Sequence, residues 1–183
     1  MTYYKKEIAT LGGGCFWCTE AVFRRVRGVR EIEAGYTGGA LRNPSYEDVC
    51  RGVTGHAEVV RITFDADEIG YYDLVAIFFH THDPTMLNRQ GYDIGTQYRS
   101  VIFFHSEDQR RVARTVKAEI AASKLWDKPL VTQIVAATEF YRADDHQQNY
   151  YTYNHANSYC TAIIAPKLAK LEREFADRLV TAQ

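Results

Sequence analysis

The stretch EIATLGGGCFWCTEAVF, residues 7–23, predicts how the chain begins to fold. Residues 7–11 have the composition of a β-strand, and three glycines, residues 12–14, permit a tight turn directly after it. The residues that follow, CFWCTEAVFRRV, continue as a helix whose first turn contains Cys15. A strand that enters a helix through such a turn indicates mixed α and β structure and places a thiol at the turn.

The rest of the chain alternates between strand and helix patterns. Four further runs predict strands: IEAGY (32–36), EVVRITF (58–64), SVIFF (100–104) and TQIVAAT (132–138). Helical spacing predicts three helices: 106–125, which opens with a capping box of Ser106 and Gln109; 73–82, which ends near Pro84; and a last helix that begins at Pro166. We therefore expect one α+β domain over residues 1–183, with a mixed β-sheet and helices packed on it.

The charge balance excludes some classes of partner. The chain has 22 Lys and Arg against 23 Asp and Glu, which gives no broad attraction to nucleic acid or to an anionic membrane. The first residues, MTYYKKEIAT, lack the apolar core of a signal peptide, and no stretch approaches the roughly 18 apolar residues of a membrane span. We expect a cytoplasmic protein whose four cysteines are redox, catalytic or metal-binding residues.

Cys15 is the candidate nucleophile. The amides and dipole of a helix N-terminus favour an anion, so we expect the pKa of Cys15 to be lowered. Cys15 and Cys18 could instead be small core residues, a thioredoxin-like CxxC pair or part of a structural zinc site. The zinc site is the weakest alternative because the sequence has no second CxxC and no HxxxH pairing. Phe16 and Trp17, taken alone, would be core residues.

A carboxyl group shares the apolar face of the strand EVVRITF. Alternation places Glu58 with Val60, Ile62 and Phe64 on one face of the strand. Burial without a cationic partner would raise the pKa of Glu58 and keep the carboxyl neutral, able to donate a proton. The alternative is a glutamate at a frayed strand end that reaches water.

Two long irregular stretches, residues 37–55 and 83–99, contain further polar candidates. Tyr46 and Tyr98 lie in them, but the chain has 13 tyrosines and composition does not single these two out. Asp93 lies between glycines and would by default be a turn residue.

The chain resembles the peptide methionine sulfoxide reductase A family. The resemblance runs from about Ile8 to Cys160 and rests on motifs that occur in the family's order: GGCFWCTE, GYTGG, NPSYEDV, TGHAEVVRITFD, HDPT, QGYDIGTQYRS, FYRADDHQQNY and NSYC. It implies a fold similar to the family's two-layer, ferredoxin-like plait and the reduction of methionine S-sulfoxide, free or in proteins. It implies no metal and no organic cofactor, because thioredoxin is the external reductant.

The resemblance also implies roles for individual residues. Cys15 would attack the sulfoxide sulfur, and Phe16 and Trp17 would line the pocket for the substrate's ε-methyl group. The proton-donating glutamate corresponds to Glu58 and the loop aspartate to Asp93. The two hydroxyl-bearing tyrosines correspond to Tyr46 and Tyr98.

The resemblance favours Cys160 as the thiol that resolves the Cys15 sulfenic acid. Cys18, one helical turn from Cys15, is the alternative, and Cys50 is expected to be structural. The sequence departs from the family at Tyr92, where Asn is common, and this puts the hydrogen bonding of Asp93 in question. Two rival functions remain at this point: a general dithiol oxidoreductase, and a non-catalytic module that binds methionine sulfoxide or senses redox state.

Overall fold

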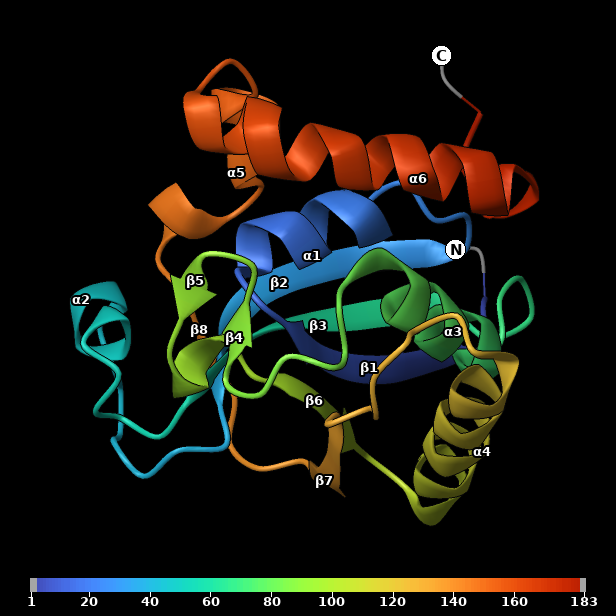
Figure 1. Ribbon diagram of the computed structural model, residues 1–183, viewed down its shortest axis with the longest axis horizontal. Helices are drawn as coiled ribbons and strands as arrows, with labels where there is room; N and C mark the ends of the chain where they lie inside the picture. Colours follow the sequence, from blue (N-terminus) through green and yellow to red (C-terminus); the bar gives the residue numbers. More distant parts are fainter. Residues whose placement is uncertain (1–2, 182–183) are drawn as a thin grey trace.

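The computed structural model describes residues 3–181, and a six-stranded sheet with the order β7-β6-β1-β3-β2-β8 runs through it (Figure 1). β6 and β7 pair in parallel, and the other neighbouring strands pair antiparallel. The strands are β1 (Lys6–Gly13), β2 (Val29–Thr37), β3 (Ala57–Asp65), β6 (Ser100–Phe104), β7 (Gln133–Ala136) and β8 (Tyr141–Arg142). The strands predicted from the sequence are confirmed. The structure adds β8 and a small hairpin of β4 (Arg89–Gln90) and β5 (Asp93–Ile94).

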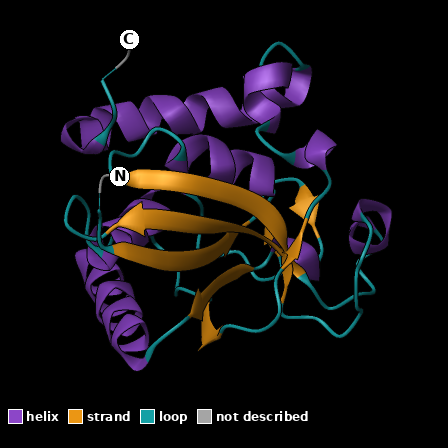
Figure 2. Ribbon diagram, turned by 180° about the vertical axis from the view of Figure 1, so that it is seen from behind, coloured by secondary structure: helices purple, strands orange, loops and turns teal. Residues whose placement is uncertain are grey.

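The longer helices pack on the sheet and on one another. They are α1 (Phe16–Phe23), α3 (Tyr71–Thr81), α4 (Glu107–Ser123) and α6 (Ala165–Phe175). α6 runs along the outer side of α1, and α1 in turn packs on β2 and β3 (Figures 1 and 2). α1 and α6 are therefore stacked on the same face of the sheet, which confirms a mixed α+β fold.

The last helical segment begins earlier than the sequence predicts. Pro166 lies in the first turn of α6, as expected, but a π-helical turn, Cys160–Ile164, leads directly into it. A proline in a first turn needs no N–H partner, so it does not show where the preceding turn starts. Cys160 is consequently held inside a helical segment and not in a loop.

The predicted capping box of α4 is only half present. The Ser106 hydroxyl accepts the Gln109 backbone N–H at 3.1 Å. The Gln109 side chain accepts from the backbone N–H of His105 instead of Ser106, and its amide donates to the carbonyl of Ile8 at 2.7 Å. Gln109 therefore connects the start of α4 to β1.

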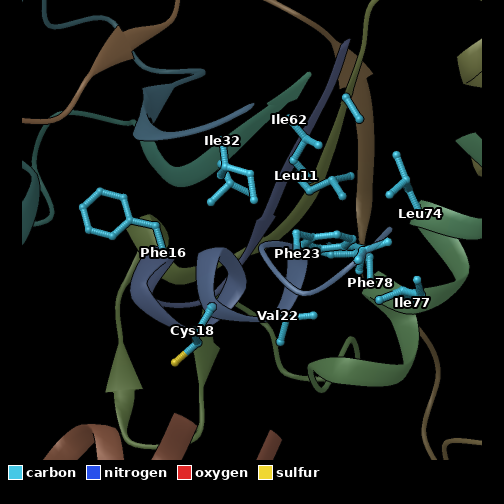
Figure 3. Packing of buried hydrophobic residues seen from close by; sticks show 14 of the residues in the cluster. Leu11, Phe16, Cys18, Val22, Phe23, Ile32, Ile62, Leu74, Ile77 and Phe78 are labelled. Atoms are coloured by element: carbon cyan, nitrogen blue, oxygen red, sulfur yellow. The ribbon is translucent and has the colours of Figure 1, made fainter. Parts of the chain in front are cut away.

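The main core lies between the sheet and helices α1 and α3. Leu11 and Ile62 of the sheet face Phe23 of α1 and Leu74 and Phe78 of α3 (Figure 3). A smaller cluster of Ala57, Val59, Val101 and Phe103 covers the opposite face, with Phe140 packed on it. Both faces of the central strands are covered, so a polar side chain on β3 is removed from water.

The segment after α6 pairs with the turn between α1 and β2. Val26 and Leu179 form an antiparallel bridge. The Arg27 N–H donates to the Arg178 carbonyl and the Val180 N–H to the Arg25 carbonyl, each at 2.8 Å. α6 is thus fastened at its far end to the helix that it covers.

Among the described residues, 3–181, no helix has both the length and the apolar character needed to cross a membrane.

Candidate active site

Cys15 lies where β1 passes into α1, at the N-cap position of the helix. Gly14 has a φ of +100°, and a Cβ there would lie 2.7 Å from the Cβ of Gln90. A Cβ on Gly13 would lie 2.9 Å from the Phe78 ring. Positive φ and such close approach are tolerated by glycine, so these residues let the thiol turn sit directly against its neighbours. The predicted strand, glycine turn and helix are confirmed.

Glu58 is buried beside this turn, as its place in the strand pattern predicts. It is 2% exposed, and its Oε2 accepts the backbone N–H of Phe16 at 3.0 Å. Burial raises the pKa of Glu58 to about 8, and the Phe16 N–H opposes this only in part. The carboxyl is therefore largely protonated at neutral pH. The alternative of a frayed strand end in water is wrong.

The pKa of Cys15 is raised, whereas its position at a helix N-terminus predicted that it would be lowered. Burial raises it well above its usual value, and the adjacent Cys18 thiol and the charge of Glu58 act in the same direction. The hydrogen bond from the Trp17 amide lowers it but does not compensate. The prediction of a lowered pKa is wrong because the thiol, although at a helix N-terminus, is almost out of contact with water. A protonated Glu58 removes one of the charges that oppose ionisation of Cys15.

Cys18 is the more acidic thiol of the pair. Its contact with the Cys15 thiol lowers the pKa of Cys18 to about 7, the Lys167 ammonium acts in the same direction, and burial opposes both. Figure 3 shows Cys18 and Phe16 leaving α1 on different sides. The Cys18 sulfur lies 3.5 Å from the Tyr159 hydroxyl, which donates to Asp93 Oδ2 at 2.7 Å.

Phe16 and Trp17 belong to a cluster of aromatic rings. Phe16 lies 5.6 Å from Tyr36 and 6.5 Å from Tyr46, measured between ring centroids. Trp17 stacks on Tyr150 at 3.7 Å with an interplanar angle of 6°, and its Nε1–H donates to Gln147 Oε1 at 3.0 Å. Tyr150 thereby covers one face of the indole, and the Tyr46 ring lies 6.5 Å from it between centroids.

Tyr46 and Tyr98 occupy short helical turns within the stretches predicted to be irregular. Tyr46 starts α2 (Tyr46–Cys50), where Ser45 and Asp48 form a complete capping box. Tyr98 ends a 3-10 turn, Thr96–Tyr98. Burial raises the pKa of both hydroxyls, and the charges of Glu58 and Cys15 contribute to each. The structure thus brings these two tyrosines into the surroundings of Glu58 and Cys15.

A cavity of about 220 Å³ opens on the Cys18 side of the thiol pair. It is lined by both thiols, by residues 90–93 of the β4–β5 hairpin, and by Tyr159, Ile163 and Lys167. Tyr92 is 93% exposed at the tip of this hairpin, while Asp93 keeps its bond to Tyr159. Glu58 and the aromatic cluster lie outside the lining. The thiol pair therefore has two different neighbours: Glu58 with the aromatic rings, and the cavity.

The other two cysteines have contrasting positions. Cys160 is 0% exposed, and its backbone N–H donates to Asn157 Oδ1 at 2.8 Å. Cys50 is exposed at the end of α2, and its carbonyl accepts from Gln97. Cys50 is therefore not a core residue, although its backbone ties α2 to the 3-10 turn.

Sequence reasoning missed several residues around the thiols. Tyr150 and Gln147 position Trp17, while Tyr159 and Lys167 lie near Cys18. The first three lie in the motifs FYRADDHQQNY and NSYC, which the sequence analysis used as whole segments. Lys167 carried no local signal because it reads as a polar position of an amphipathic helix. Among residues 3–181, no group of three His, Cys, Asp or Glu is placed to hold a metal ion.

Two adjacent thiols beside a buried, protonated carboxyl define a thiol-dependent redox site. A thiol can take an oxygen atom as a sulfenic acid, a second thiol can displace it, and the carboxyl can supply the proton that the oxygen needs. Comparison with known proteins gives a more specific result.

The peptide methionine sulfoxide reductase family matches residues 7–179. Peptide methionine sulfoxide reductase MsrA of Deinococcus radiodurans is 51% identical over 174 residues, covering 95% of this chain and 84% of the relative. The protein of the same name from Polynucleobacter asymbioticus is 53% identical over 169 residues, covering 92% of this chain and 89% of the relative.

Solved structures agree with this match. Reduced Mxr1 from Saccharomyces cerevisiae superposes with a TM-score of 0.78 at 34% identity, covering 85% of this chain and 90% of that one. Mxr1 in complex with Trx2 gives a TM-score of 0.55 at 26% identity, with 82% and 90% coverage. The chain belongs to the peptide methionine sulfoxide reductase family.

Proposed function

We propose that the protein reduces methionine S-sulfoxide, free or in proteins, with Cys15 as the nucleophile. The observation that carries the proposal is the buried Glu58 carboxyl, which accepts the N–H of the residue directly after Cys15 and whose pKa burial raises to about 8. In the first step the Cys15 sulfur is oxidised to a sulfenic acid, the sulfoxide sulfur is reduced to a thioether, and methionine leaves. The oxygen atom passes from one sulfur to the other.

Glu58 is the proton donor of this step. A sulfoxide oxygen is a poor leaving group, so attack at sulfur needs a proton on that oxygen. Glu58 supplies it, and the proton that Cys15 loses restores the carboxyl. Tyr46 and Tyr98 provide hydrogen bonds to the developing charge, a role supported by the effect of Glu58 and Cys15 on the pKa of both hydroxyls.

Phe16 and Trp17 hold the ε-methyl group of the substrate. The near-parallel arrangement of both rings with Tyr46, at 6.5 Å, supports a small apolar pocket there. An unbranched methyl group beside aromatic rings is favoured by apolar contact, and the polar sulfoxide oxygen is then directed toward Glu58.

Cys18 is the resolving thiol in this proposal. It is hydrogen-bonded to Cys15, it lines the same cavity, and its pKa is lowered to about 7. Cys160, which the resemblance favours, is fully buried at the start of a π-helical turn and is not among the residues that line this cavity. The step gives a Cys15–Cys18 disulfide and water.

Thioredoxin then reduces the disulfide, which needs no metal or organic cofactor because the thiols carry both electrons. The complex of yeast Mxr1 with Trx2 supports this partner. The cytoplasm, where thioredoxin keeps thiols reduced, is the location we propose.

For the fold, we infer that residues 1–183 form one domain with a ferredoxin-like plait. The succession β1-α1-β2-β3-α3-β6 and the antiparallel order β6-β1-β3-β2 support this description. β7 and β8 extend the sheet at its two edges.

The reaction is tested by NADPH consumption with thioredoxin and thioredoxin reductase. We expect turnover on methionine S-sulfoxide, none on the R epimer, and none for Cys15→Ser. Reduction of insulin disulfides without turnover on either epimer would establish a general dithiol oxidoreductase instead. Stoichiometric oxidation without turnover would establish a sensing module.

The resolving thiol is tested separately with Cys18→Ser and Cys160→Ser. Cys18→Ser should release one methionine per protein and accumulate the Cys15 sulfenic acid, detected by dimedone trapping and mass spectrometry. Cys160→Ser is the matched control and should continue to turn over. The reverse result would return the resolving role to Cys160.

A further inference from the structure

Cys18, Tyr159 and Asp93 form a continuous line of polar contacts built from three separate elements. Cys18 lies on α1, Tyr159 directly precedes the π-helical turn, and Asp93 starts β5. The Cys18 sulfur is 3.5 Å from the Tyr159 oxygen, and the Tyr159 oxygen is 2.7 Å from Asp93 Oδ2. Thus a carboxylate is linked to the thiol through a single phenol.

The direction of these hydrogen bonds follows from the proton count. A phenol has one proton, and Tyr159 donates it to Asp93. Either atom of the Cys18–Tyr159 contact could be the donor, so while Tyr159 donates to Asp93 its oxygen can accept the S–H of Cys18. This arrangement provides a path for the proton of Cys18, through the Tyr159 oxygen to Asp93.

Neighbouring side chains pack against Tyr159 and change the pKa of Cys18. The Trp17 ring meets the Tyr159 ring edge-on at 5.7 Å between centroids. Lys167 of α6 lies on the same cavity and lowers the pKa of Cys18, while the charge of Asp93 raises it. On the opposite side Cys18 contacts Cys15, behind which lies the protonated Glu58.

We propose that Tyr159 and Asp93 act as the general base that removes the proton of Cys18 while it attacks the Cys15 sulfenic acid. This inference rests on the proposed Cys15–Cys18 disulfide. The disulfide step needs two opposite proton movements, one away from the attacking thiol and one onto the departing oxygen. The two sides of the thiol pair separate these tasks.

The step balances as follows. The Cys18 sulfur bonds to the Cys15 sulfur as the Cys15 S–O bond breaks, so Cys18 is oxidised and the Cys15 sulfur is reduced. The proton of Cys18 passes to the Tyr159 oxygen while the Tyr159 proton passes to Asp93. The departing hydroxide takes the proton of Glu58 and leaves as water. Exchange with solvent then returns a proton from Asp93 to Glu58.

Two substitutions interrupt the path in different ways. Tyr159→Phe removes the relay oxygen. Asp93→Asn leaves an acceptor for the Tyr159 hydrogen bond but no group that takes a proton. Tyr71→Phe is the matched control, because the buried Tyr71 hydroxyl has no hydrogen-bond partner among residues 3–181.

The measurement is the rate at which the sulfenic acid becomes a disulfide, followed after one turnover without reductant. Samples quenched with dimedone are analysed by mass spectrometry, so the readout does not depend on how well substrate binds. At about pH 6, below the pKa of Cys18, Tyr159→Phe and Asp93→Asn should slow this step by roughly 10²-fold, and Tyr71→Phe should not. At about pH 9 the rates of all proteins should converge, since Cys18 then ionises without help.

The outcomes separate the inference from the proposed function. If the unaltered protein forms no Cys15–Cys18 disulfide, both the resolving role of Cys18 and the relay are wrong. If that disulfide forms and Tyr159→Phe forms it equally fast at about pH 6, the relay alone is wrong. A slow Tyr159→Phe variant that high pH does not rescue would mean that Tyr159 only positions Cys18, which also overturns the relay.

Discussion

Glu58 and Cys15 each hold a proton in the resting site, because burial raises the pKa of both groups. The carboxyl does not need to gain a proton before the reaction, and it carries no negative charge that would oppose ionisation of the thiol. A substrate sulfoxide therefore meets a protonated carboxyl that can donate a proton and a thiol whose ionisation this neutral carboxyl does not oppose.

Replacing Glu58 with glutamine removes the acid but keeps an oxygen that can accept the Phe16 N–H. Glu58→Gln should slow methionine release in a single turnover by roughly 10²- to 10⁴-fold. The unaltered protein should lose activity as pH rises through about 8, because Glu58 then loses its proton, and the variant should not show this decrease. A single-turnover rate that is unchanged at neutral pH would remove Glu58 from the role of proton donor.

Trp17 offers a test of the methyl pocket. Trp17→Ala deletes the indole surface against Tyr46, and loss of one methyl contact is worth about 1–3 kcal/mol, so KM should rise by roughly 10-fold or more. Trp126→Ala is the matched control, because Trp126 donates to the Phe79 carbonyl and lines a different cavity, together with Asp83 and Lys128. Steady-state kinetics on free methionine sulfoxide give the comparison. Equal KM values for both variants would contradict the pocket.

Patterns in the local sequence predicted the positions of some site residues but not of others. The glycine turn located Cys15, and strand alternation placed Glu58 inside. Tyr159 and Asp93 are 66 positions apart, and their contact depends on how the hairpin and the last helices meet, which no local pattern encodes. The prediction of a lowered pKa for Cys15 was wrong for a related reason, because segments distant in the sequence bury this thiol.

Among the elements, α2 (Tyr46–Cys50) is short and depends on its cap. Ser45 accepts the Asp48 N–H, and Asp48 accepts the Ser45 N–H, so the box fixes the first residue of the helix, Tyr46. Ser45→Ala should cost about 1 kcal/mol locally and lower kcat through displacement of the Tyr46 hydroxyl.

Ser106→Ala is the matched control for this effect because Ser106 caps α4, away from the thiols. It should lower the free energy of unfolding by about 1 kcal/mol and leave kcat unchanged. Urea unfolding and initial rates measure both quantities. If the two variants affect kcat equally, the cap of α2 does not position Tyr46.

The longer elements that the sequence predicted have extended apolar signals. β1 and β3 are buried on both faces over most of their length, and α4 buries one helical face, so all three could be found from the sequence. β4, β5 and β8 are two residues long, too short for a period, and exist because neighbouring chain segments supply their partners. The π-helical turn before α6 is likewise set by packing.

For the whole molecule, two buried groups set the dependence of stability on pH. His82 is buried with Nδ1 on the Phe78 carbonyl and Nε2 on the Ser100 hydroxyl, and burial lowers its pKa from 6.5 to about 3. Between these values the unfolded chain binds more protons, so stability falls on acidification. Glu58, raised from 4.5 to about 8, binds its proton in the folded state, so stability falls as pH rises through that range.

The two slopes oppose one another where they overlap. The free energy of unfolding should be flat between about pH 4.5 and 6.5 and fall below and above this range by up to about 1.4 kcal/mol per pH unit, until about pH 7, where ionisation of Cys18, whose pKa is lowered to about 7, begins to oppose the Glu58 slope. Urea unfolding across this range measures it. His82→Gln should remove the acid limb and Glu58→Gln the alkaline limb. Persistence of both limbs in both variants would assign them to other groups.

The fastening of residues 178–180 to residues 25–27 has a consequence for biosynthesis. α1, which begins next to Cys15, leaves the ribosome long before Lys167 and the strand partner of Val26 have been translated. A nascent chain therefore carries its thiols on a helix that lacks its outer cover. The cavity beside the thiols is completed only when the last helix docks, and until then the thiols lack that cover.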